Sequence, residues 1–371
     1  MKELTLKPTI YQYDTCNAFF TEFHIGIDDL IITNKRVYDN YLKSYVKGAA
    51  ILFRENYGSG EPSDEMVEAM YENVQKISYD RVIAIGGGSI LDIAKIFALK
   101  NISPVINLFD HKLEITKEKE LVLVPTTCGT GSEVTNISIL EIKSRHTKLG
   151  LATDELYADT AVMIPELLEC LPVGVFATSS IDAFIHAIES YLSPKASSYT
   201  KIFSIKAMEM ILTGYKKIKK EGIDTRNSLL KDFLLASNYA GIAFGNAGCA
   251  AVHAMSYPLG TKYHVPHGEA NYAMFTEVFK KYESLNPNGY IKELNEFLAN
   301  LLECEESKVY EEIEILFNYL IPKKKLREYG VNENELEVFT DSVIENQGRL
   351  MANNYVKLDR EQVYDIYKAL Y

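Results

Sequence analysis

The sequence lacks the features of a secreted or disulfide-bonded protein. Its five cysteines are scattered, and no two of them form a C-x-x-C pair. Segment 1–8 contains no apolar core of the kind that a signal peptide needs. This cysteine usage is typical of a reduced, intracellular chain. We therefore expect a cytoplasmic protein with no export signal.

Long apolar runs and an excess of positive charge are also missing. The least polar stretch, 240–252, is interrupted by Asn246 and is too short to span a bilayer, so we interpret it as a buried helix. The formal net charge is −12, which argues against nucleic acid as a main partner. Two lysine-rich runs, 216–220 and 323–327, are interpreted as solvated helix ends. We expect neither a membrane nor a nucleic acid as a partner.

The first half of the chain alternates between strand-like and helix-like segments. We expect a helix over 35–47 and another that begins after an N-capping Ser63, with Ile77 on the inner face of the second. Short apolar runs predict strands at 28–34, 51–53, 81–85, 105–108 and 121–124. This alternation indicates an α/β domain with a mainly parallel sheet.

The second half is expected to be helical throughout. Helical periodicity is clearest at 203–219, 229–244, 290–302 and 307–320. A chain of 371 residues is long enough for roughly two domains. We predict an α/β nucleotide-binding domain over 1–176 and an all-helical domain over 177–371.

Two loops rich in glycine and hydroxyl side chains follow predicted strands. In the first, three glycines and Ser89 lie between strand 81–85 and a helix, so backbone N–H groups could approach a pyrophosphate. The second, 124–133, crowds threonines and glycines together. Neither is the G-x-G-x-x-G fingerprint, and tight turns without a ligand are the alternative. Together the two loops favour a dinucleotide-sized crevice.

A carboxylate and an imidazole lie four residues apart in segment 179–190. On a helix, Asp182 and His186 would project from one face and could bind a divalent metal together, although a surface hydrogen-bonded pair is the commoner reason for this spacing. Apolar neighbours indicate burial, and buried ionisable groups need partners. His253 and His267 could supply them across a turn. One carboxylate and three imidazoles suit Fe²⁺ or Zn²⁺.

The helix that carries His253 has an expected end. We predict that the Gly/Ala-rich helix runs through His253 and stops near Tyr257, because Pro258 disfavours helix at the residue before it. Segment 266–268 is expected to open the next helix, and His264 is not needed for the metal set.

Four motifs together resemble the iron-containing (group III) alcohol dehydrogenases. They are 86–95, 125–130, 182–189 and 253–268, in the family's order. The resemblance implies a dinucleotide-binding α/β domain followed by an all-α domain, the dehydroquinate synthase-like architecture, with NAD and a metal as cofactors. It implies metal ligands at Asp182, His186, His253 and His267. It implies cofactor contacts at Asn34, Gly87, Gly88, Ser89, Asp92, Thr126, Thr127, Thr130 and Lys148.

Within the family, segments 127–136 and 264–271 look most like those of 4-hydroxybutyrate dehydrogenases. This implies interconversion of 4-hydroxybutyrate and succinic semialdehyde. Other primary alcohols or diols (1,3-propanediol, 1,2-propanediol with lactaldehyde, butanol) are the alternatives, and a dehydroquinate synthase-like cyclase is a further one. A homodimer or larger homo-oligomer is expected.

The sequence departs from the family pattern at two functional positions. Many members have histidine four residues after the third ligand, where this chain has Tyr257, so Tyr257 is a candidate for proton transfer. NAD-preferring members often have aspartate where this chain has Asn34, so NADP remains an alternative to NAD. Lys262 is a candidate to bind the carboxylate of the substrate.

Overall fold

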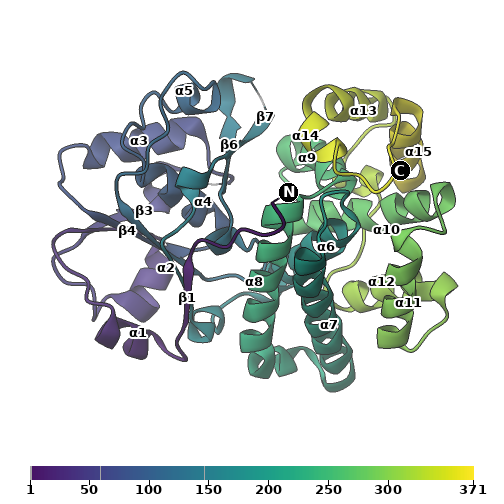
Figure 1. Ribbon diagram of the computed structural model, residues 1–371, viewed down its shortest axis with the longest axis horizontal. Helices are drawn as coiled ribbons and strands as arrows, with labels where there is room; N and C mark the ends of the chain where they lie inside the picture. The colour runs from purple at the N-terminus through teal and green to yellow at the C-terminus, as the bar shows by residue number, and fades with distance from the viewer. Residues whose placement is uncertain (1, 59, 146) are drawn as a thin grey trace. The chain divides into compact units, whose positions relative to one another are not determined.

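The computed structural model describes residues 2–58, 60–145 and 147–371. It contains two compact units (Figure 1). One is Leu6–Leu171, and the other is Pro172–Tyr371 together with the N-terminal residues up to Thr5. The first is α/β and the second is almost entirely helical, which confirms the predicted fold class. None of the described helices is long and apolar enough to cross a bilayer.

The first unit is organised around a six-stranded parallel sheet with the order β1-β8-β5-β4-β2-β3, and β6 and β7 form a separate antiparallel pair. The strands are β1 Thr9–Gln12, β2 Asp29–Thr33, β3 Ala50–Phe53, β4 Arg81–Gly86, β5 Glu120–Pro125, β6 Ile137–Ile142, β7 Thr147–Ala152 and β8 Thr160–Met163. The helices of this unit are α1 Cys16–Glu22, α2 Lys35–Val37, α3 Asp64–Val74, α4 Gly88–Phe97 and α5 Val105–Phe109.

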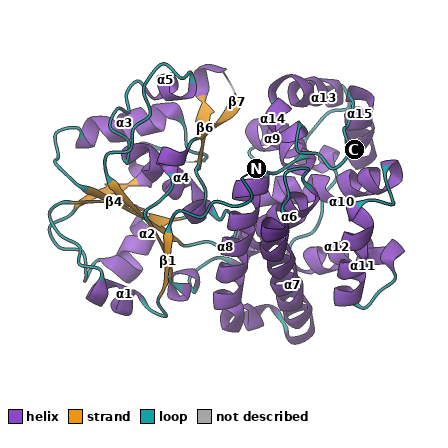
Figure 2. Cartoon of the chain, in the orientation of Figure 1, coloured by secondary structure: helices purple, strands orange, loops and turns teal. Residues whose placement is uncertain are grey.

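The central strands are buried on both faces, which explains why they form near-continuous apolar runs. Alternate residues Leu30 and Ile32 of β2 pack with Val82 of β4 against α3, α4 and α5, while Ile31 and Ile83 point to the other face and are equally buried. Figure 2 shows α3, α4 and α5 on one side of the strands and α1 and α2 on the other. The result is a parallel sheet between two layers of helices.

Two predicted elements of this unit differ from the structure. Segment 105–108 is not a strand but α5, because Pro104 supplies an extended N-cap residue and Glu68 accepts the backbone N–H of Val105. A short apolar run fits either a strand or a buried helix, so periodicity alone misassigned it. The helix predicted over 35–47 is shorter in the structure. α2 continues into a π-helical turn over Tyr38–Leu42, and the helical segment ends at Leu42.

Ser63 caps α3 as predicted, its hydroxyl accepting the N–H of Met66. The helix ends at Val74, however, so Ile77 lies beyond it and is 42% exposed. The prediction that Ile77 belongs to the inner face was wrong, because the helix is one turn shorter than the apolar spacing indicated.

The second unit is a helical assembly that begins with α6 Val173–Leu192, α7 Ser198–Glu221, α8 Leu230–Ala247, α9 Ala251–Tyr263 and α10 His267–Leu285. It continues with α11 Tyr290–Leu302, α12 Val309–Leu320, α13 Glu335–Asn346, α14 Gly348–Met351 and α15 Arg360–Leu370. All four predicted helical segments fall within these elements or overlap them. From Ser180 to Leu192 every residue of α6 is buried. Phe184 of α6 packs edge-on against Phe275 and Phe317, which fixes α6 at the centre.

The helix around His253 was predicted incorrectly. α8 stops at Ala247 because Gly248 has a φ of 82°, and a new helix, α9, begins at Ala251. His253 therefore lies in the first turn of α9, not at the end of the preceding helix. α9 also continues through Pro258 to Tyr263, where His264 takes the left-handed conformation of a C-cap. α10 does begin at His267, as the sequence predicted.

The contact between α6 and α10 provides the first testable prediction. A Cβ at Gly268 would overlap the backbone carbonyl oxygen of Thr178, so the two helices can approach this closely only with glycine there. We expect Gly268→Ala to lower the thermal midpoint by the equivalent of about 1–3 kcal/mol and to weaken metal binding, because the neighbouring His267 moves with α10.

Gly174→Ala is the matched control, because a Cβ at this α6 position meets no atom within 4 Å. In scanning calorimetry, Gly174→Ala should have an unchanged or slightly raised thermal midpoint. In Mn²⁺ titration, its affinity should equal that of the wild-type chain. A Gly268→Ala protein with the midpoint and Mn²⁺ affinity of the control would contradict the close approach.

Candidate active site

The carboxyl ends of three adjacent strands hold the residues predicted to bind a cofactor. β2 lies between β3 and β4, and β4 pairs with β5 on its other side. The chain leaves β2 toward β3 and returns on the opposite side at β4, so β2 and β4 flank a topological switch point. Asn34 follows β2, the glycine turn follows β4 and Thr126 follows β5. Ligands of open parallel sheets bind at such a position.

The two loops touch each other. A Cβ at Gly88 would lie 2.6 Å from the methyl carbon of Thr130, and one at Gly87 would lie 3.4 Å from that of Thr127. The absence of a Cβ at Gly88 therefore lets the two loops form one surface. No side chain among the described residues caps the start of α4, where Gly87 is the N-cap. Free amide groups at a helix N-terminus are suited to bind a pyrophosphate, so this surface fits a dinucleotide.

Asp92 and Lys95 fix the two loops relative to each other. The carboxylate of Asp92 accepts hydrogen bonds from the hydroxyl of Ser132 (2.5 Å) and the N–H of Ile139 (3.1 Å). The fully buried Lys95 donates to the hydroxyls of Ser132 (2.7 Å) and Thr135 (3.1 Å). Burial lowers the pKa of Lys95, with the nearby Asp92 opposing that effect. Both side chains thus bind protein groups and shape the cofactor surface from beneath.

Two other predicted cofactor residues lie in the same unit. The side chain of Asn34 caps α2 by accepting the N–H of Val37 at 2.9 Å. Lys148, in β7, is buried and forms a 3.1 Å ion pair with Glu61.

The predicted metal residues come from three helices of the second unit. Asp182 and His186 project from α6, with 4.0 Å between the carboxylate and Nδ1. Asp182 Oδ1 lies 3.7 Å from Nε2 of His253 in α9 and 3.8 Å from Nε2 of His267 in α10. Asp182, His186 and His253 are each at least 95% buried. The structure therefore brings together all four predicted ligands.

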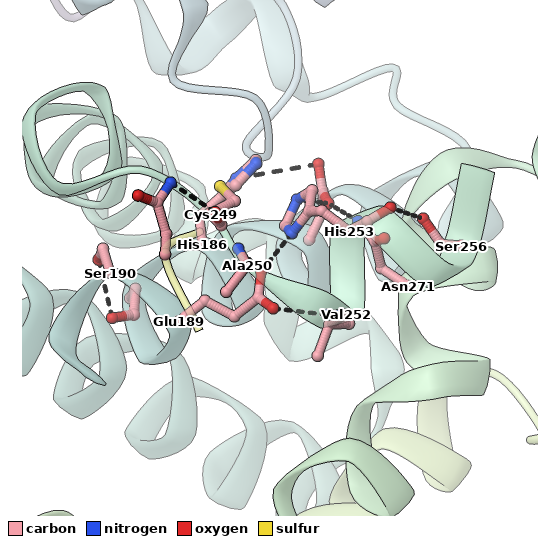
Figure 3. A network of polar contacts seen from close by, with 12 residues as sticks. His186, Glu189, Ser190, Cys249, Ala250, Val252, His253, Ser256 and Asn271 are labelled. Atoms are coloured by element: carbon pink, nitrogen blue, oxygen red, sulfur yellow. Dashed lines mark hydrogen bonds and ion pairs between the residues drawn. The ribbon is translucent and has the colours of Figure 1, made fainter. Parts of the chain in front are cut away.

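Glu189 orients His253. Its carboxylate lies 2.6 Å from Nδ1 of His253 and also accepts the backbone N–H groups of Ala250 (3.1 Å) and Val252 (2.7 Å) (Figure 3). In the neutral ring Nδ1 then carries the proton, and Nε2, which can bind an ion once it has lost its own proton, faces Asp182 and His267. Nε2 is buried and has no hydrogen-bond partner among the described residues. A buried ring nitrogen left in this state is suited to bind a metal ion.

The charges of the cluster are mutually dependent. Burial alone would raise the pKa of Asp182, but the charges of His186 and His267 outweigh it and hold that pKa well below its usual range. Burial would lower the pKa of His253, yet the neighbouring Cys249 and Glu189 raise it well above its ordinary value. Asn271 donates to Asp182 at 2.7 Å. A compact set of one carboxylate and three imidazoles, buried except for the half-buried His267, fits Fe²⁺ or Zn²⁺.

Three residues of this site were not assigned a role from the sequence: Glu189, Cys249 and Asn271. Glu189 lies seven residues after Asp182, so helical spacing on α6 was the available signal. Asn271 lies one turn after His267 on α10 and was detectable in the same way. Cys249 lies in the break between α8 and α9, a position that no periodicity indicates.

Tyr257 and Lys262 both lie on α9, but in different surroundings. The ring of Tyr257 is buried, with its centroid 6.1 Å from that of His267, and burial raises the pKa of its hydroxyl. Lys262 is 57% exposed in its side chain and forms an ion pair with Glu335. Tyr257 is therefore next to the metal ligands, whereas Lys262 is bound to another part of the helical unit.

Comparison with known proteins covers both units. The profile described as "Fe-containing alcohol dehydrogenase family, C-terminal" matches residues 176–371, and the one described as "Iron-containing alcohol dehydrogenase" matches residues 15–165. The chain is 53% identical to a 4-hydroxybutyrate dehydrogenase of Clostridium kluyveri over 371 residues, with both chains fully covered. It is 34% identical to long-chain-alcohol dehydrogenase 1 of Geobacillus thermodenitrificans over 329 residues, which cover 84% of this chain and 80% of that protein.

Solved structures share the fold. Sulfoacetaldehyde reductase from Bifidobacterium kashiwanohense in complex with NAD⁺ superposes with a TM-score of 0.85 at 21% identity, covering 100% of this chain and 98% of that one. A structure described as an iron containing alcohol dehydrogenase has a TM-score of 0.80 at 22% identity, with 99% and 98% covered.

The contact between Glu189 and His253 provides the second prediction. Glu189→Gln leaves an oxygen to accept the N–H of Val252 but replaces the charged partner of His253 with an amide. We expect Mn²⁺ affinity, measured by isothermal titration calorimetry, to fall roughly 10- to 100-fold, as for other residues that orient a ligand histidine. Glu209→Gln, which removes a carboxylate from the exposed pair with Lys206, is the control. Equal affinities of the two variants would disprove the orienting role.

Proposed function

The chain belongs to the iron-containing alcohol dehydrogenase family, and from this premise we propose that it interconverts 4-hydroxybutyrate and succinic semialdehyde with NAD(H) and Fe²⁺. The observation that carries the proposal is the set of three buried residues, Asp182, His186 and His253, and the half-buried His267, in which Glu189 leaves Nε2 of His253 available. The 53% identity over the full length of a 4-hydroxybutyrate dehydrogenase supports the choice of substrate.

The chain's own residues would bind, orient and protonate. When bound, the metal would supply Lewis acidity for the alcohol oxygen and the nicotinamide would supply the redox chemistry. Asp182, His186, His253 and His267 would hold the ion. Gly87, Gly88, Ser89, Thr126, Thr127 and Thr130 would line the dinucleotide. The hydroxyl of Tyr257, whose pKa burial raises, is protonated at neutral pH and would be the group that donates a proton to the oxygen of the aldehyde during reduction.

The ion and the form of the nicotinamide cofactor are assigned from the relatives. We propose Fe²⁺ over Zn²⁺ from the family and NAD over NADP because a related structure binds NAD⁺. Asn34 at the end of β2 is neutral and would repel a 2′-phosphate only weakly. The rate with NADP⁺ should therefore be compared with the rate with NAD⁺. Asp92 and Lys148, both bound to protein groups, would position the cofactor loops.

We also propose a cytoplasmic homodimer or larger homo-oligomer. All five cysteines, each among the described residues, are outside any disulfide, which suits a reducing compartment. β1 is an edge strand whose four residues are exposed, including Ile10 and Tyr11. An exposed apolar edge is a place where a second copy could pair.

The substrate panel is the decisive experiment. The purified chain loaded with Fe²⁺ or Zn²⁺ should form NADH fastest from 4-hydroxybutyrate, ahead of 1-butanol, 1,3-propanediol and 1,2-propanediol, with NADP⁺ as the parallel cofactor. Asp182→Ala should lose metal and at least about a thousandfold of the rate, because the ion would lose its carboxylate ligand. Absence of NADH from every alcohol while metal is shown to be bound would overturn the dehydrogenase function.

The carboxylate of the substrate needs a cation, and Arg349 is the better candidate. α14 packs against α9, and Arg349 is near enough to lower the pKa of Tyr257, against the larger opposing effect of burial. It has no ion pair within the described part of the chain, whereas Lys262 is paired with Glu335.

We predict that Arg349→Gln raises the KM for 4-hydroxybutyrate roughly 10- to 100-fold, since a hydrogen bond to a charged group contributes about 1.5–3 kcal/mol. The KM for 1-butanol should not change, because butanol has no carboxylate. Lys262→Gln is the paired variant and should leave both constants unchanged. If Lys262→Gln, and not Arg349→Gln, weakens only the hydroxy acid, the anchor is Lys262.

A further inference from the structure

Cys249 is a buried thiol that the proposed reaction does not use. It follows Gly248 in the break between α8 and α9 and is 6% exposed. The side-chain amide of Asn353 donates to its carbonyl oxygen at 3.1 Å, which fixes the backbone there. Its sulfur lies within 4.8 Å of a ring nitrogen of His186 and a ring nitrogen of His253 (Figure 3). One sulfur and two imidazole nitrogens, all potential metal ligands, therefore lie close together.

Two of these three ligands are fixed in place by their neighbours. The ring of His186 stacks between Phe244, with centroids 4.1 Å apart, and His253, at 4.6 Å. His253 is held by Glu189 and leaves Nε2 buried and without a hydrogen-bond partner among the described residues. That nitrogen is an observation independent of the thiol, and it points to a bound cation.

The cluster thus contains two donor sets that overlap at His253. Asp182, His253 and His267 form one, and His186, Cys249 and His253 form the other. The first offers oxygen and nitrogen, which suit Mn²⁺ and Fe²⁺. The second offers sulfur and nitrogen, which suit a softer ion such as Cd²⁺. Each set consists of side chains that are buried or half-buried.

We propose that Cys249, with His186 and His253, forms a second, thiolate-containing position for a soft divalent cation within the metal centre. The inference rests on the metal centre of the proposed function and extends it to a ligand outside the four predicted ones. On binding, the thiol loses its proton to solvent and the sulfur donates an electron pair to the ion, with no change of oxidation state. Because both positions use His253, one ion excludes the other.

Occupation of the two positions would have different effects. An ion bound by Asp182 and His267 lies on the side of Tyr257, whose ring is near His267. An ion bound by Cys249 would not be bound by Asp182 and His267. Soft cations should therefore compete with Mn²⁺ for the protein. A bound soft cation would be held by Cys249 and not by Asp182 and His267.

Titration of the metal-stripped full chain tests the proposal without an activity assay. Cd²⁺ should produce a near-ultraviolet thiolate-to-cadmium absorption band that saturates at a single equivalent, and ¹¹³Cd NMR should show one sulfur ligand. Cys249→Ser should lose the band, and its Cd²⁺ affinity should fall about tenfold or more. Its Mn²⁺ affinity should remain within about twofold, since the oxygen and nitrogen set is intact.

Cys304→Ser, a cysteine of the same unit outside the metal cluster, is the control and should keep both the band and the affinities. Mn²⁺ binding to the wild-type chain with no thiolate band from bound Cd²⁺ would overturn the inference, as would a band that persists in Cys249→Ser. A band with no Mn²⁺ binding would instead contradict the dehydrogenase metal centre. The NMR measurement on the wild-type chain decides the matter even if Cys249→Ser does not fold.

Discussion

One buried carboxylate, that of Glu189, connects the fold to the chemistry of the site. The first turn of α9 has no side-chain cap of its own, and Glu189 of α6 accepts the N–H groups of Ala250 and Val252 in its place. The same carboxylate fixes the tautomer of His253. The start of a helix and the orientation of a metal ligand thus depend on a single group.

The two cofactor regions are built by the same physical means on different scaffolds. In the α/β unit, the buried Lys95 and the half-buried Asp92 bind backbone and hydroxyl groups and hold two loops together. In the helical unit, Glu189 and Asn271 bind the ligands themselves. In both, a buried polar group is retained because each of its bonds fixes a segment whose backbone would otherwise have several conformations.

The sequence predicted the parts of the site that depend on local periodicity. Asp182 and His186 share a face of α6 because helical residues four apart do so in any sequence context, and β4 was recognisable from its unbroken apolar run. The break at Gly248 was not predicted, since the flanking alanines continue a helical pattern and only the positive φ interrupts it. Pro258 caused the opposite error, because a helix end was predicted near Tyr257 although α9 continues to Tyr263. A proline within a helix removes one hydrogen bond, and the packing of α9 tolerates that loss.

Contacts between segments distant in sequence account for the rest, and they decide specificity. Helical spacing can place Asp182 and His186 together, but only the fold determines that Cys249 enters the same cluster and that Arg349 lies near Tyr257. The opposed pKa shifts of Asp182 and His253 show that the charges compensate one another before any ion is considered. A site organised in this way binds an ion by replacing protons, so the identity of the ion depends on which neighbour competes for His253.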